Sequence, residues 1–411
     1  MKTLQIGNID TKGGRFNGAD LHQALLKRGI KSQLCVSMKK TEDENTWQLS
    51  LFFGSRILKF IVRQIEKLLS IQSILYPSFL LLYFDKRFLE ADIVHYHLIH
   101  TGFFSILALP KLSQMKPTVW TLHDPWAMTG HCIYPFDCIR WKKGCGKCPR
   151  LDTHIPMFID NTKLMWKIKR WVYSRSNLDI VVASKWMLDM VKQSPLFSNC
   201  RIHYIPFGID LNVFHPMNAK EAKKLLGVNP NSIVLAFRAT TSEFKGLSYV
   251  RECIQKLRCD EPICLLTIGE KNLLGEFGDK YEIVDLGWID ESKLPLFYNA
   301  CDIFLMPSTA EAFGVMVIEA MACGKPVIVF DGTSLPEVIF APKGGIVVPQ
   351  GDVEALRVAI EDLISNSKMR QEIGNSACSI AKENYDAHIF LNRIIELYAK
   401  VIENRKKQIR I

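Results

Sequence analysis

The stretch DIFLMPSTAEAFGVMVIEAMACGKPVIVFDGTSLP, which runs from Asp302 to Pro336, decides the fold of this chain. Its apolar run IFLM predicts a strand, the residues from about Phe313 predict a helix, and VIVF predicts a second strand. A strand, a helix and a strand in this order form the repeating unit of a parallel α/β sheet. The helix is apolar apart from Glu319, so this carboxylate must either reach a cleft or carry a large desolvation penalty.

Polar groups gather at the start of this helix. Gly314 opens it, where backbone N–H groups without partners form a natural anion site. Glu311 lies on the loop just before the helix, eight residues ahead of Glu319. Two interpretations stay open on this local pattern. One is a structural unit with a capping Glu and a solvated Glu, and the other is a helix N-terminus that faces a phosphate while the carboxylates hold hydroxyl groups.

The segment EAFGVMVIEAMACGKPVI resembles the Glu-x7-Glu signature of the retaining nucleotide-sugar glycosyltransferases of family 4, which have the GT-B architecture. The resemblance implies an α/β fold of two Rossmann-like domains that face each other across a cleft. It also implies that Glu311 contacts the donor sugar at the catalytic centre and that Glu319 holds the ribose hydroxyls. Phe313 and Gly314, which lie between them, are implied to belong to the same donor-binding site.

The composition is that of a globular protein with more than one domain. The chain has 411 residues, of which 48% are hydrophobic and 23% are charged, so two or three domains with sizeable cores are expected. The start MKTLQIGNID has no apolar signal region, and the apolar run at 71–84 contains Pro77 and is too short to span a bilayer. We therefore expect a cytoplasmic protein.

The net charge of +10 is carried by the first half of the chain. Residues 1–205 hold 29 Lys and Arg against 15 Asp and Glu, whereas residues 206–411 hold 23 against 27. Such a basic half is expected to face an anionic surface, either nucleic acid or a membrane leaflet.

Residues 55–69, SRILKFIVRQIEKLL, predict a basic amphipathic helix of the kind that lies in a membrane interface. A surface helix with a solvated basic face is the alternative. The family resemblance favours the membrane, since many relatives extend lipid-linked glycans at its cytoplasmic face. We therefore expect a peripheral membrane protein without a nucleic-acid partner.

Alternating strands and helices predict two domains of the same kind. Apolar runs predict strands at Leu4–Ile6, Leu34–Val36, Ile93–His97, Val119–Leu122 and Ile180–Ala183, and in the second half at Ile233–Phe237, Cys264–Ile268, Ile283–Leu286, Ile303–Met306, Val327–Phe330 and Ile346–Val348. A crossing punctuated by Pro and Gly, IPFGID at 205–210, separates the two sets. We expect an acceptor-side domain at 1–205, a nucleotide-sugar-binding domain at 206–385, and a last helix at 386–411, which in GT-B proteins returns to the first domain.

Three further residues are implied to hold the donor. Gly14 belongs to a glycine pair after the first strand, which lets the backbone approach a phosphate closely. Arg238 and Lys245 bracket the turn FRATTSEFKG after the first strand of the second domain, where two cations would neutralise a diphosphate leaving group. In the family an Arg and a Lys of this turn have that role.

His123 and Asp124 end the predicted strand Val119–Leu122, at the edge where open α/β sheets bind ligands. A lone His at such a place is more often structural than catalytic. The resemblance implies that His123 is catalytic and contacts the donor sugar or the acceptor region. Asp124 is then expected either to orient that imidazole or to act as a base on the acceptor side.

Four of the twelve cysteines, Cys132, Cys138, Cys145 and Cys148, fall within seventeen residues. Four thiols with a Cys-x2-Cys end permit a tetrahedral structural zinc site, and plain thiols or a redox-labile pair are equal alternatives. A subset of family-4 enzymes has a similar Cys-rich insertion. Catalysis itself is expected to need no metal ion, because cationic side chains and a helix terminus supply the charge.

The leading hypothesis is a retaining glycosyltransferase that moves a hexose from a nucleotide diphosphate sugar, a UDP- or GDP-sugar, to a glycan acceptor. The resemblance implies a lipid-linked acceptor in surface polysaccharide or O-antigen synthesis, at the inner face of the cell membrane. The alternatives are a nucleotide-sugar epimerase or phosphorylase on the same scaffold, or a zinc-bearing nucleic-acid-binding protein.

Overall fold

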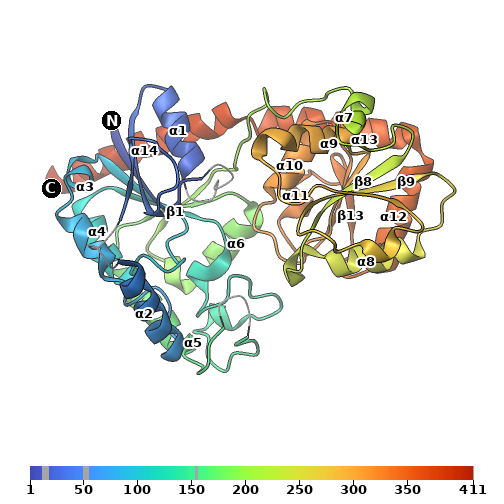
Figure 1. The fold of residues 1–411 in the computed structure, drawn as a ribbon. Helices are drawn as coiled ribbons and strands as arrows, with labels where there is room; N and C mark the ends of the chain where they lie inside the picture. The colour runs from blue at the N-terminus through green and yellow to red at the C-terminus, as the bar shows by residue number, and fades with distance from the viewer. Residues whose placement is uncertain (12–17, 50–54, 153–155, 411) are drawn as a thin grey trace. The chain divides into compact units, whose positions relative to one another are not determined.

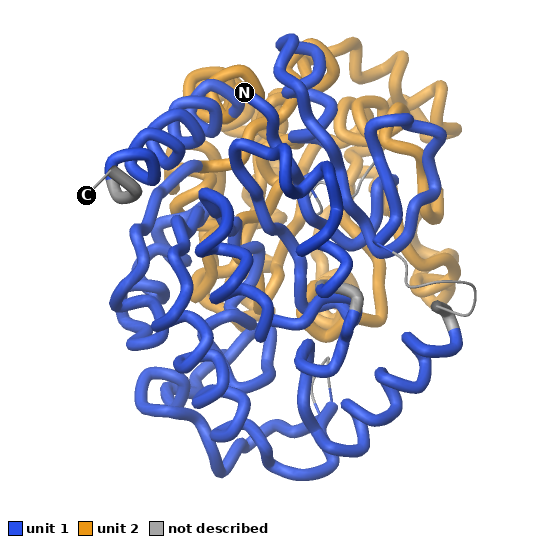
Figure 2. The backbone as a smooth tube through the Cα atoms, turned by 90° about the vertical axis from the view of Figure 1, so that its left-hand side faces the viewer, with its two compact units in different colours: residues 1–205, 391–411 blue, residues 206–390 orange. Residues whose placement is uncertain are grey.

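The computed structural model describes residues 1–11, 18–49, 55–152 and 156–410. The chain divides into two compact units, which Figure 2 colours separately. Unit 1 consists of Met1–Ile205 with Leu391–Ile411, and unit 2 is Pro206–Phe390. Each unit is built on one parallel sheet with helices around it (Figure 1).

The described residues of unit 1 form a seven-stranded sheet in the order β3-β2-β1-β4-β5-β6-β7. Every neighbouring pair is parallel. The order reverses direction between β1 and β4, which in open α/β sheets is the place where a ligand crevice opens at the carboxyl ends of the strands. The strands are β1 (Lys2–Ile9), β2 (Lys31–Met38), β3 (Thr46–Gln48), β4 (Ile93–Tyr96), β5 (Thr118–Leu122), β6 (Asp179–Val182) and β7 (Arg201–Tyr204).

The helices of unit 1 begin and end where the local chemistry favours it. The first begins after Gly18, whose φ of 79° suits glycine, and Lys27 in its last turn faces the negative end of the helix dipole. The helices are α1 (Ala19–Lys27), α2 (Ser55–Leu68), α3 (Lys86–Glu90), α4 (Leu109–Met115), α5 (Thr162–Ser174) and α6 (Lys185–Gln193), with most of α14 (Ala387–Arg410).

Unit 2 repeats the plan with a six-stranded sheet in the order β10-β9-β8-β11-β12-β13, again parallel throughout. Its order reverses between β8 and β11. The strands are β8 (Ile233–Ala239), β9 (Ile263–Gly269), β10 (Glu282–Asp285), β11 (Ile303–Met306), β12 (Val327–Phe330) and β13 (Gly345–Val348). The helices are α7 (Ala219–Leu225), α8 (Leu247–Lys256), α9 (Leu294–Ala300), α10 (Val315–Ala322), α11 (Leu335–Val338), α12 (Val353–Ser365) and α13 (Ser367–Asn384).

Helices cover both faces of the unit 2 sheet. On one face Leu235, Phe237 and Leu305 pack with apolar residues of α8 and α12. On the other face α10 packs against α9 and α13 (Figure 1). A parallel sheet buried on both sides needs apolar residues at nearly every strand position, which is why these strands are continuous apolar runs in the sequence.

The predicted strands are all present, and two further strands were not predicted. β3 is only three residues long, and β7, with the sequence RIHY, is polar and half-exposed at the edge of its sheet. Edge strands do not need an apolar run, so periodicity does not reveal them. One detail differs: the helix expected from about Phe313 begins at Val315. Arg238, expected to bracket the turn at the C-terminal end of its strand, is the last residue but one of β8.

The crossing segment at 205–210 pairs with the segment that precedes α14. The Ile209 N–H donates to the Tyr385 carbonyl at 2.8 Å, and the Ala387 N–H donates to the Ile209 carbonyl at 2.9 Å. A side chain at Gly208 would press on the backbone of Ala387, because a Cβ there would lie 2.7 Å from the Ala387 Cα. The glycine of this crossing is therefore required by a close backbone approach.

Among the described residues, none of the helices is both long and apolar enough to cross a membrane.

Gly246, the residue before α8, has a φ of 75°, and a Cβ on it would overlap the carbonyl oxygen of Pro307. Gly227 has nearly the same φ, 74°, but a Cβ there would meet open space. We expect Gly246→Ala to lower the free energy of unfolding by about 2–4 kcal/mol, from backbone strain and steric overlap together. Gly227→Ala, which adds strain alone, should cost about 1 kcal/mol. Urea unfolding of both variants measures the difference, and equal losses would contradict the steric contact.

Candidate functional site

The carboxyl edge of the unit 2 sheet brings two strand-to-helix turns together. β8 and β11 are neighbours, and the sheet order reverses between them. The turns touch, since the Thr309 N–H donates to the Phe244 carbonyl at 3.0 Å. Helix α8 then begins after Gly246 and α10 after Gly314, both in the left-handed conformation. Two helix N-termini at one sheet edge give this place a positive potential.

Two cations stand at this edge, as the sequence predicts. The Lys245 Nζ lies 2.7 Å from the Glu311 Oε2, so one ion pair joins the two turns. Arg238 is half-buried on β8, and its guanidinium carbon lies 4.8 Å from the centre of the exposed Trp288 ring. Burial lowers the pKa of Arg238, and the nearby Glu311 carboxylate opposes that shift. Arg238, Lys245 and Glu311 are therefore close together in the structure.

Two buried polar atoms at the same edge have no hydrogen-bond partner in the part of the chain that the structure describes. They are the Arg238 Nε and the Ser308 Oγ. Most buried polar atoms in folded proteins are hydrogen-bonded, so such atoms call for an explanation, of which a missing ligand is one. Nothing in the sequence singles out Ser308 apart from its place in the turn that follows β11.

The other predicted donor residues of unit 2 are held inside the domain. Glu319 is buried, and its Oε2 accepts a hydrogen bond of 2.6 Å from the Tyr298 hydroxyl on α9. This bond offsets part of the desolvation cost of the carboxylate. The Phe313 ring is also buried and packs edge-on against Phe207 and Tyr385. Only the backbone of this segment, through the N-terminus of α10, points to ligand binding.

His123 and Asp124 follow β5 in unit 1. The His123 Nε2 lies 3.5 Å from the His97 Nδ1, and the two rings are stacked. Asp124 accepts a hydrogen bond from the Trp126 N–H at 2.9 Å and lies 3.2 Å from the His100 Nε2. Burial raises the pKa of Asp124, but His100 and the hydrogen bonds lower it by more than burial raises it. The pKa is therefore below its ordinary value, and the carboxyl is ionised. Asp124 therefore orients His100, and its low pKa makes it a weak base.

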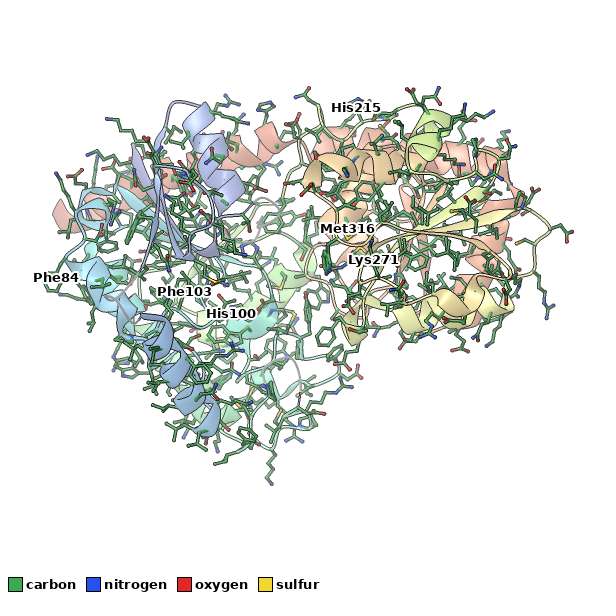
Figure 3. The ribbon with its side chains drawn as sticks, in the orientation of Figure 1. Phe84, His100, Phe103, His215, Lys271 and Met316 are labelled. Carbon is green, nitrogen blue, oxygen red and sulfur yellow. The ribbon has the colours of Figure 1, made fainter. Side chains whose placement is uncertain are left out.

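A buried lysine, which sequence reasoning missed, holds the turn that carries Asp124. Lys169 on α5 donates to the Trp126 carbonyl at 2.6 Å and to the Thr129 carbonyl at 2.9 Å, and its ammonium lies over the Trp126 ring. Burial lowers the pKa of Lys169 to about 7. The ring of His100, labelled in Figure 3, stacks on the Trp126 ring, with the two ring centroids 4.6 Å apart.

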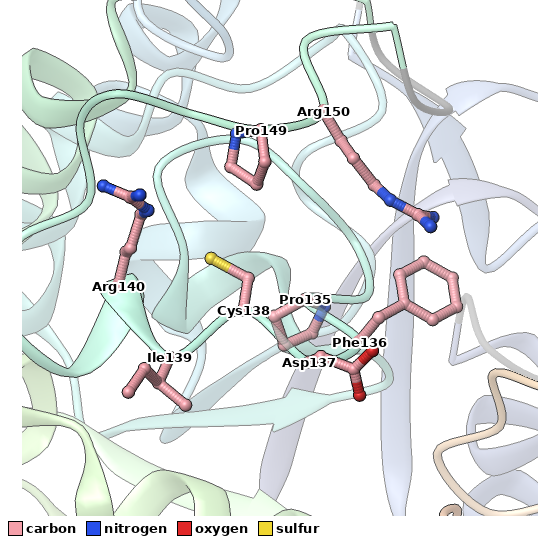
Figure 4. A pocket seen from close by; sticks show the side chains of 8 residues that line it. All are labelled: Pro135, Phe136, Asp137, Cys138, Ile139, Arg140, Pro149 and Arg150. Atoms are coloured by element: carbon pink, nitrogen blue, oxygen red, sulfur yellow. The ribbon is translucent and has the colours of Figure 1, made fainter.

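The four-cysteine segment forms an irregular loop with a small pocket (Figure 4). The pocket has a volume of about 320 Å³ and is lined by Pro135, Phe136, Asp137, Cys138, Ile139, Arg140, Pro149 and Arg150. All twelve cysteines lie in the described ranges and are free thiols. The Gly130 N–H donates to the Cys145 Sγ, and the Cys148 Sγ lies 3.6 Å from the His131 Nε2.

No group of three or more His, Cys, Asp and Glu in the described residues is arranged to hold a metal ion. Burial raises the pKa of Cys132 to about 11 and that of Cys145 to about 12, and such values keep both thiols protonated. Zinc bound by Cys132, Cys138, Cys145 and Cys148 therefore stays a prediction. Gly14 lies outside the described residues.

Two more histidines lie beside His123 and were also missed. His95 is completely buried on β4, and burial lowers its pKa to about 3; burial also lowers the pKa of His97 and of His123 well below the ordinary value. All three rings are therefore neutral. The signal in the sequence was HYH at 95–97, a polar residue at alternate positions of a strand that is otherwise apolar.

His95 predicts a pH dependence of stability. Its pKa is about 3 in the folded chain and about 6.5 when unfolded, so between these values the unfolded chain binds a proton that the folded chain lacks. The free energy of unfolding therefore rises with pH up to about 6.5 and falls as the pH is lowered. His95→Asn should remove about 2–3 kcal/mol of the change between about pH 6.5 and about pH 4.5, measured by urea unfolding. His215→Asn, at an exposed position (Figure 3), should leave the pH profile as it is; identical profiles for both variants would refute the prediction.

Two family models match the chain. "Glycosyltransferase Family 4" matches residues 19–213, and "Glycosyl transferases group 1" matches residues 218–379. A putative colanic acid biosynthesis glycosyl transferase, WcaC of Escherichia coli, is 25% identical over 86% of this chain and 88% of its own. An N,N'-diacetylbacillosaminyl-diphospho-undecaprenol alpha-1,3-N-acetylgalactosaminyltransferase of Campylobacter jejuni is 29% identical over 48% of this chain and 54% of its own, so that match spans about half of each protein.

The fold is that of solved glycosyltransferase structures. HepE of Anabaena, crystallised with UDP and glucose, superposes with a TM-score of 0.67 over 97% of this chain and 100% of that chain, at 16% identity. At that identity the likeness concerns the fold, two Rossmann-like domains. Together with the two family models, it leads to one conclusion: the chain is a family-4 glycosyltransferase with the GT-B fold.

Proposed function

We propose that this glycosyltransferase is a retaining enzyme that moves a hexose from a UDP- or GDP-sugar to a glycan acceptor, lipid-linked in surface-polysaccharide or O-antigen synthesis. One observation carries the donor part of this proposal. At the sheet reversal of unit 2, two cations, two buried polar atoms without partners in the described residues, and two helix N-termini stand together. A diphosphate is the group that such a place suits, since it carries charge and accepts many hydrogen bonds.

The catalytic step in this proposal is stabilisation of the leaving nucleoside diphosphate. Lys245 exchanges the Glu311 carboxylate for a phosphate oxygen, and the Arg238 Nε and the Ser308 hydroxyl gain the partners that they lack among the described residues. Charge that develops on the diphosphate is then met by fixed charges and by the N-terminus of α10. These groups supply the positive charge, so the proposal needs no metal cofactor.

Release of Lys245 leaves Glu311 available for the hexose. Glu311 is positioned on the turn before α10, where its carboxylate accepts hydrogen bonds from sugar hydroxyls in the proposed complex. Glu319, which accepts a hydrogen bond from Tyr298, has the role of holding the ribose hydroxyls in this proposal. Each such hydrogen bond replaces one that the hydroxyl would make to water. It therefore favours binding of the nucleotide sugar over binding of a diphosphate without those hydroxyls.

The acceptor part rests on unit 1. Its neutral His123 lies at the carboxyl edge of the sheet, where a neutral imidazole can exchange a hydrogen bond with a sugar hydroxyl without a charge. The relatives named above act, by their names, in colanic acid biosynthesis and on a diphospho-undecaprenol substrate. Those names motivate a lipid-linked acceptor here. The family also favours a transferase over the epimerase or phosphorylase alternatives.

Helix α2 supports a membrane-bound acceptor because its apolar side faces outward. Ile57, Phe60 and Leu68 are 67%, 62% and 69% exposed. Two polar residues face inward: the Lys59 Nζ lies 3.2 Å from the Ser37 carbonyl, and Glu66 is buried, whereas Arg63 and Lys67 are exposed beside the apolar side chains. A surface helix of a globular protein has the opposite arrangement, with the apolar stripe toward the core.

The buried Glu66 fixes this orientation. Its carboxylate accepts three backbone hydrogen bonds, at 2.7–3.0 Å, from the N–H groups of Ser73, Ile74 and Leu75. Turning the apolar side of α2 inward would break these bonds and leave a buried carboxylate or three N–H groups without partners. The outward apolar face is therefore a fixed feature of unit 1.

The outward face of α2 continues into the segment before α5. The Ser70 hydroxyl, just after α2, accepts hydrogen bonds of 2.9 Å from the N–H groups of Phe158 and Ile159, whose side chains are exposed. The Lys67 ammonium lies 5.5 Å from the centre of the Phe158 ring. Exposed apolar side chains with cations among them are what an anionic lipid leaflet binds.

A thermal-shift screen with UDP, GDP and ADP tests the donor site. One nucleotide should raise the melting temperature by about 5–10 °C at about 100 times its Kd. Lys245→Ala should weaken its binding at least about tenfold, the cost of one charge-assisted hydrogen bond. The matched control is Lys224→Ala, an exposed lysine of α7, which should bind as the unaltered protein does. If no nucleotide stabilises the protein and the two variants behave alike, the donor site is wrong. The anomeric configuration of the product, read by NMR, tests retention.

Flotation with vesicles of anionic or zwitterionic phospholipid tests the membrane face. The protein should float with the anionic vesicles, and the double variant Ile57→Asp, Phe60→Asp should lose at least about tenfold in affinity, because two apolar side chains no longer enter the interface. Leu225→Asp, at a residue of α7 that is 66% exposed, is the control and should float normally. Equal flotation of all three proteins would exclude α2 as the contact.

A further inference from the structure

A row of polar side chains crosses one face of the unit 1 sheet. Its members, called the polar row below, are Gln5 on β1, His95 on β4, His97 just after β4, Thr121 on β5, His123 just after β5, and Tyr398 on α14. Gln5 and His95 are paired in the parallel register. Side chains alternate between the faces of a strand, so residues two apart point to the same side. The row thus runs from the sheet centre toward the carboxyl edge, where His123 stands.

The Gln5 amide joins two branches of the polar row. Its Nε2 donates to the Tyr398 hydroxyl at 3.1 Å, and its Oε1 lies 3.0 Å from the His97 Nε2. The Tyr398 hydroxyl lies 2.6 Å from the His95 Nδ1 and 3.5 Å from the Gln5 Oε1, so its proton goes to the nearer imidazole. The other nitrogen of His95 lies 2.7 Å from the Thr121 Oγ1.

These contacts determine the position of each proton. An amide oxygen only accepts, so the bond between Gln5 and His97 requires a proton on the His97 Nε2. A neutral imidazole carries one proton, and the His97 Nδ1 is therefore an acceptor. The His123 Nε2 lies 3.5 Å from that atom and donates to it. His123 thus carries its proton on Nε2 and a lone pair on Nδ1.

We propose that Gln5 and Tyr398 are positioning residues that fix, through His97, which ring nitrogen of His123 carries the proton. The inference rests on the proposed function, in which His123 meets a sugar hydroxyl. With the lone pair on Nδ1, His123 presents an acceptor and no N–H at this buried atom. The opposite tautomer would offer an N–H at this atom and would favour an acceptor group there.

Tyr398 is required because the chain could otherwise run in reverse. If the Gln5 amide turned over, its NH₂ would meet the His97 Nε2, and the protons of His97 and His123 would both move to the other nitrogen. The Tyr398 hydroxyl donates to His95 and accepts from Gln5, which selects one orientation of the amide. The C-terminal helix therefore sets a tautomer at the edge of the sheet.

The surroundings keep the polar row neutral and in place. Burial lowers the pKa of His97 and of His123, so neither ring takes a second proton near neutral pH. The rings of His95 and His97 are stacked with centroids 4.3 Å apart. Gly18, with a φ of 79°, lies directly against the His97 ring, since a Cβ there would overlap it. This contact and the stacking on His95 fix the plane of the His97 ring, and the hydrogen bond from its Nε2 to Gln5 selects one of the two flipped orientations.

The test is nitrogen NMR of the protein labelled with ¹⁵N-histidine, with and without the change Tyr398→Phe. Tautomers of neutral imidazole differ in which nitrogen carries the proton, and signals are assigned by His97→Gln and His123→Gln variants. The unaltered protein should show the Nε2–H tautomer at His97 and His123, and Tyr398→Phe should give a mixture. In a glycosyl-transfer assay, Tyr398→Phe should lower kcat about fivefold to tenfold with less than a twofold change in the KM for the donor, as expected for one weakened hydrogen bond.

Tyr96→Phe is the matched control, because it removes a hydroxyl from β4, the strand that carries His95, on the opposite face of the sheet. The Tyr96 hydroxyl is buried and has no hydrogen-bond partner in the described part of the chain. This variant should leave both the nitrogen signals and kcat unchanged. If Tyr398→Phe fails to fold, Gln5→Met breaks the same chain between its two branches and should give the same mixture at His97 and His123.

The proposal is overturned if His123 in the unaltered protein carries its proton on Nδ1, or if Tyr398→Phe and Gln5→Met leave the tautomers of His97 and His123 as they were. The NMR readout does not depend on activity. A protein that shows the predicted tautomers but transfers no sugar would therefore refute the proposed function and leave the polar row standing.

Discussion

The direct contact between the turn after β8 and the turn after β11 is the constraint on which the candidate donor site depends. Gly246 has no Cβ to hold the Pro307 carbonyl away, the Thr309 N–H reaches the Phe244 carbonyl, and Lys245 reaches Glu311. The two backbone contacts depend on each other, because moving the turns apart to make room for a Cβ at position 246 would also lengthen the hydrogen bond between Thr309 and Phe244. The site is thus assembled by backbone packing, and the charged side chains use a geometry that glycine makes possible.

The segment EAFGVMVIEAMACGKPVI also holds its own helix, α10, in place. Lys325, in the Gly-Lys-Pro segment, is half-buried and donates to the Asn299 carbonyl near the end of α9 at 2.9 Å. Glu319 accepts from Tyr298, which precedes Asn299. Two charged residues of the signature therefore tie α10 and the residues after it to α9. Part of what makes this signature recognisable is structural, and only the residues at the N-terminus of α10 and on the turn before it point toward a ligand.

The sequence was informative where the structure depends on local pattern. Strands buried on both faces must be apolar runs, and they were found, whereas the half-exposed RIHY of β7 gave no such signal. Arg238, Lys245 and Glu311 were found through a resemblance that covers the turns after β8 and β11. Ser308, Tyr298 and Lys169 were not, because each acquires its role from partners that only the fold brings near. Likewise the composition of α2 was plain, but its outward apolar side depends on Glu66, which bonds to residues seven to nine positions later.

The two units place opposite chemistry at equivalent points of the same sheet order. Where unit 2 reverses, between β8 and β11, it has cations and helix N-termini. Where unit 1 reverses, between β1 and β4, it has imidazoles whose burial suppresses their charge. A charged imidazole there would cost the desolvation of an ion and would attract phosphate, in competition with the site of unit 2. Neutral rings avoid both effects, and they can still discriminate hydroxyl donors from acceptors by the position of one proton. In the proposed function, a single fold thus serves phosphate recognition with fixed charge and hydroxyl recognition with a fixed tautomer.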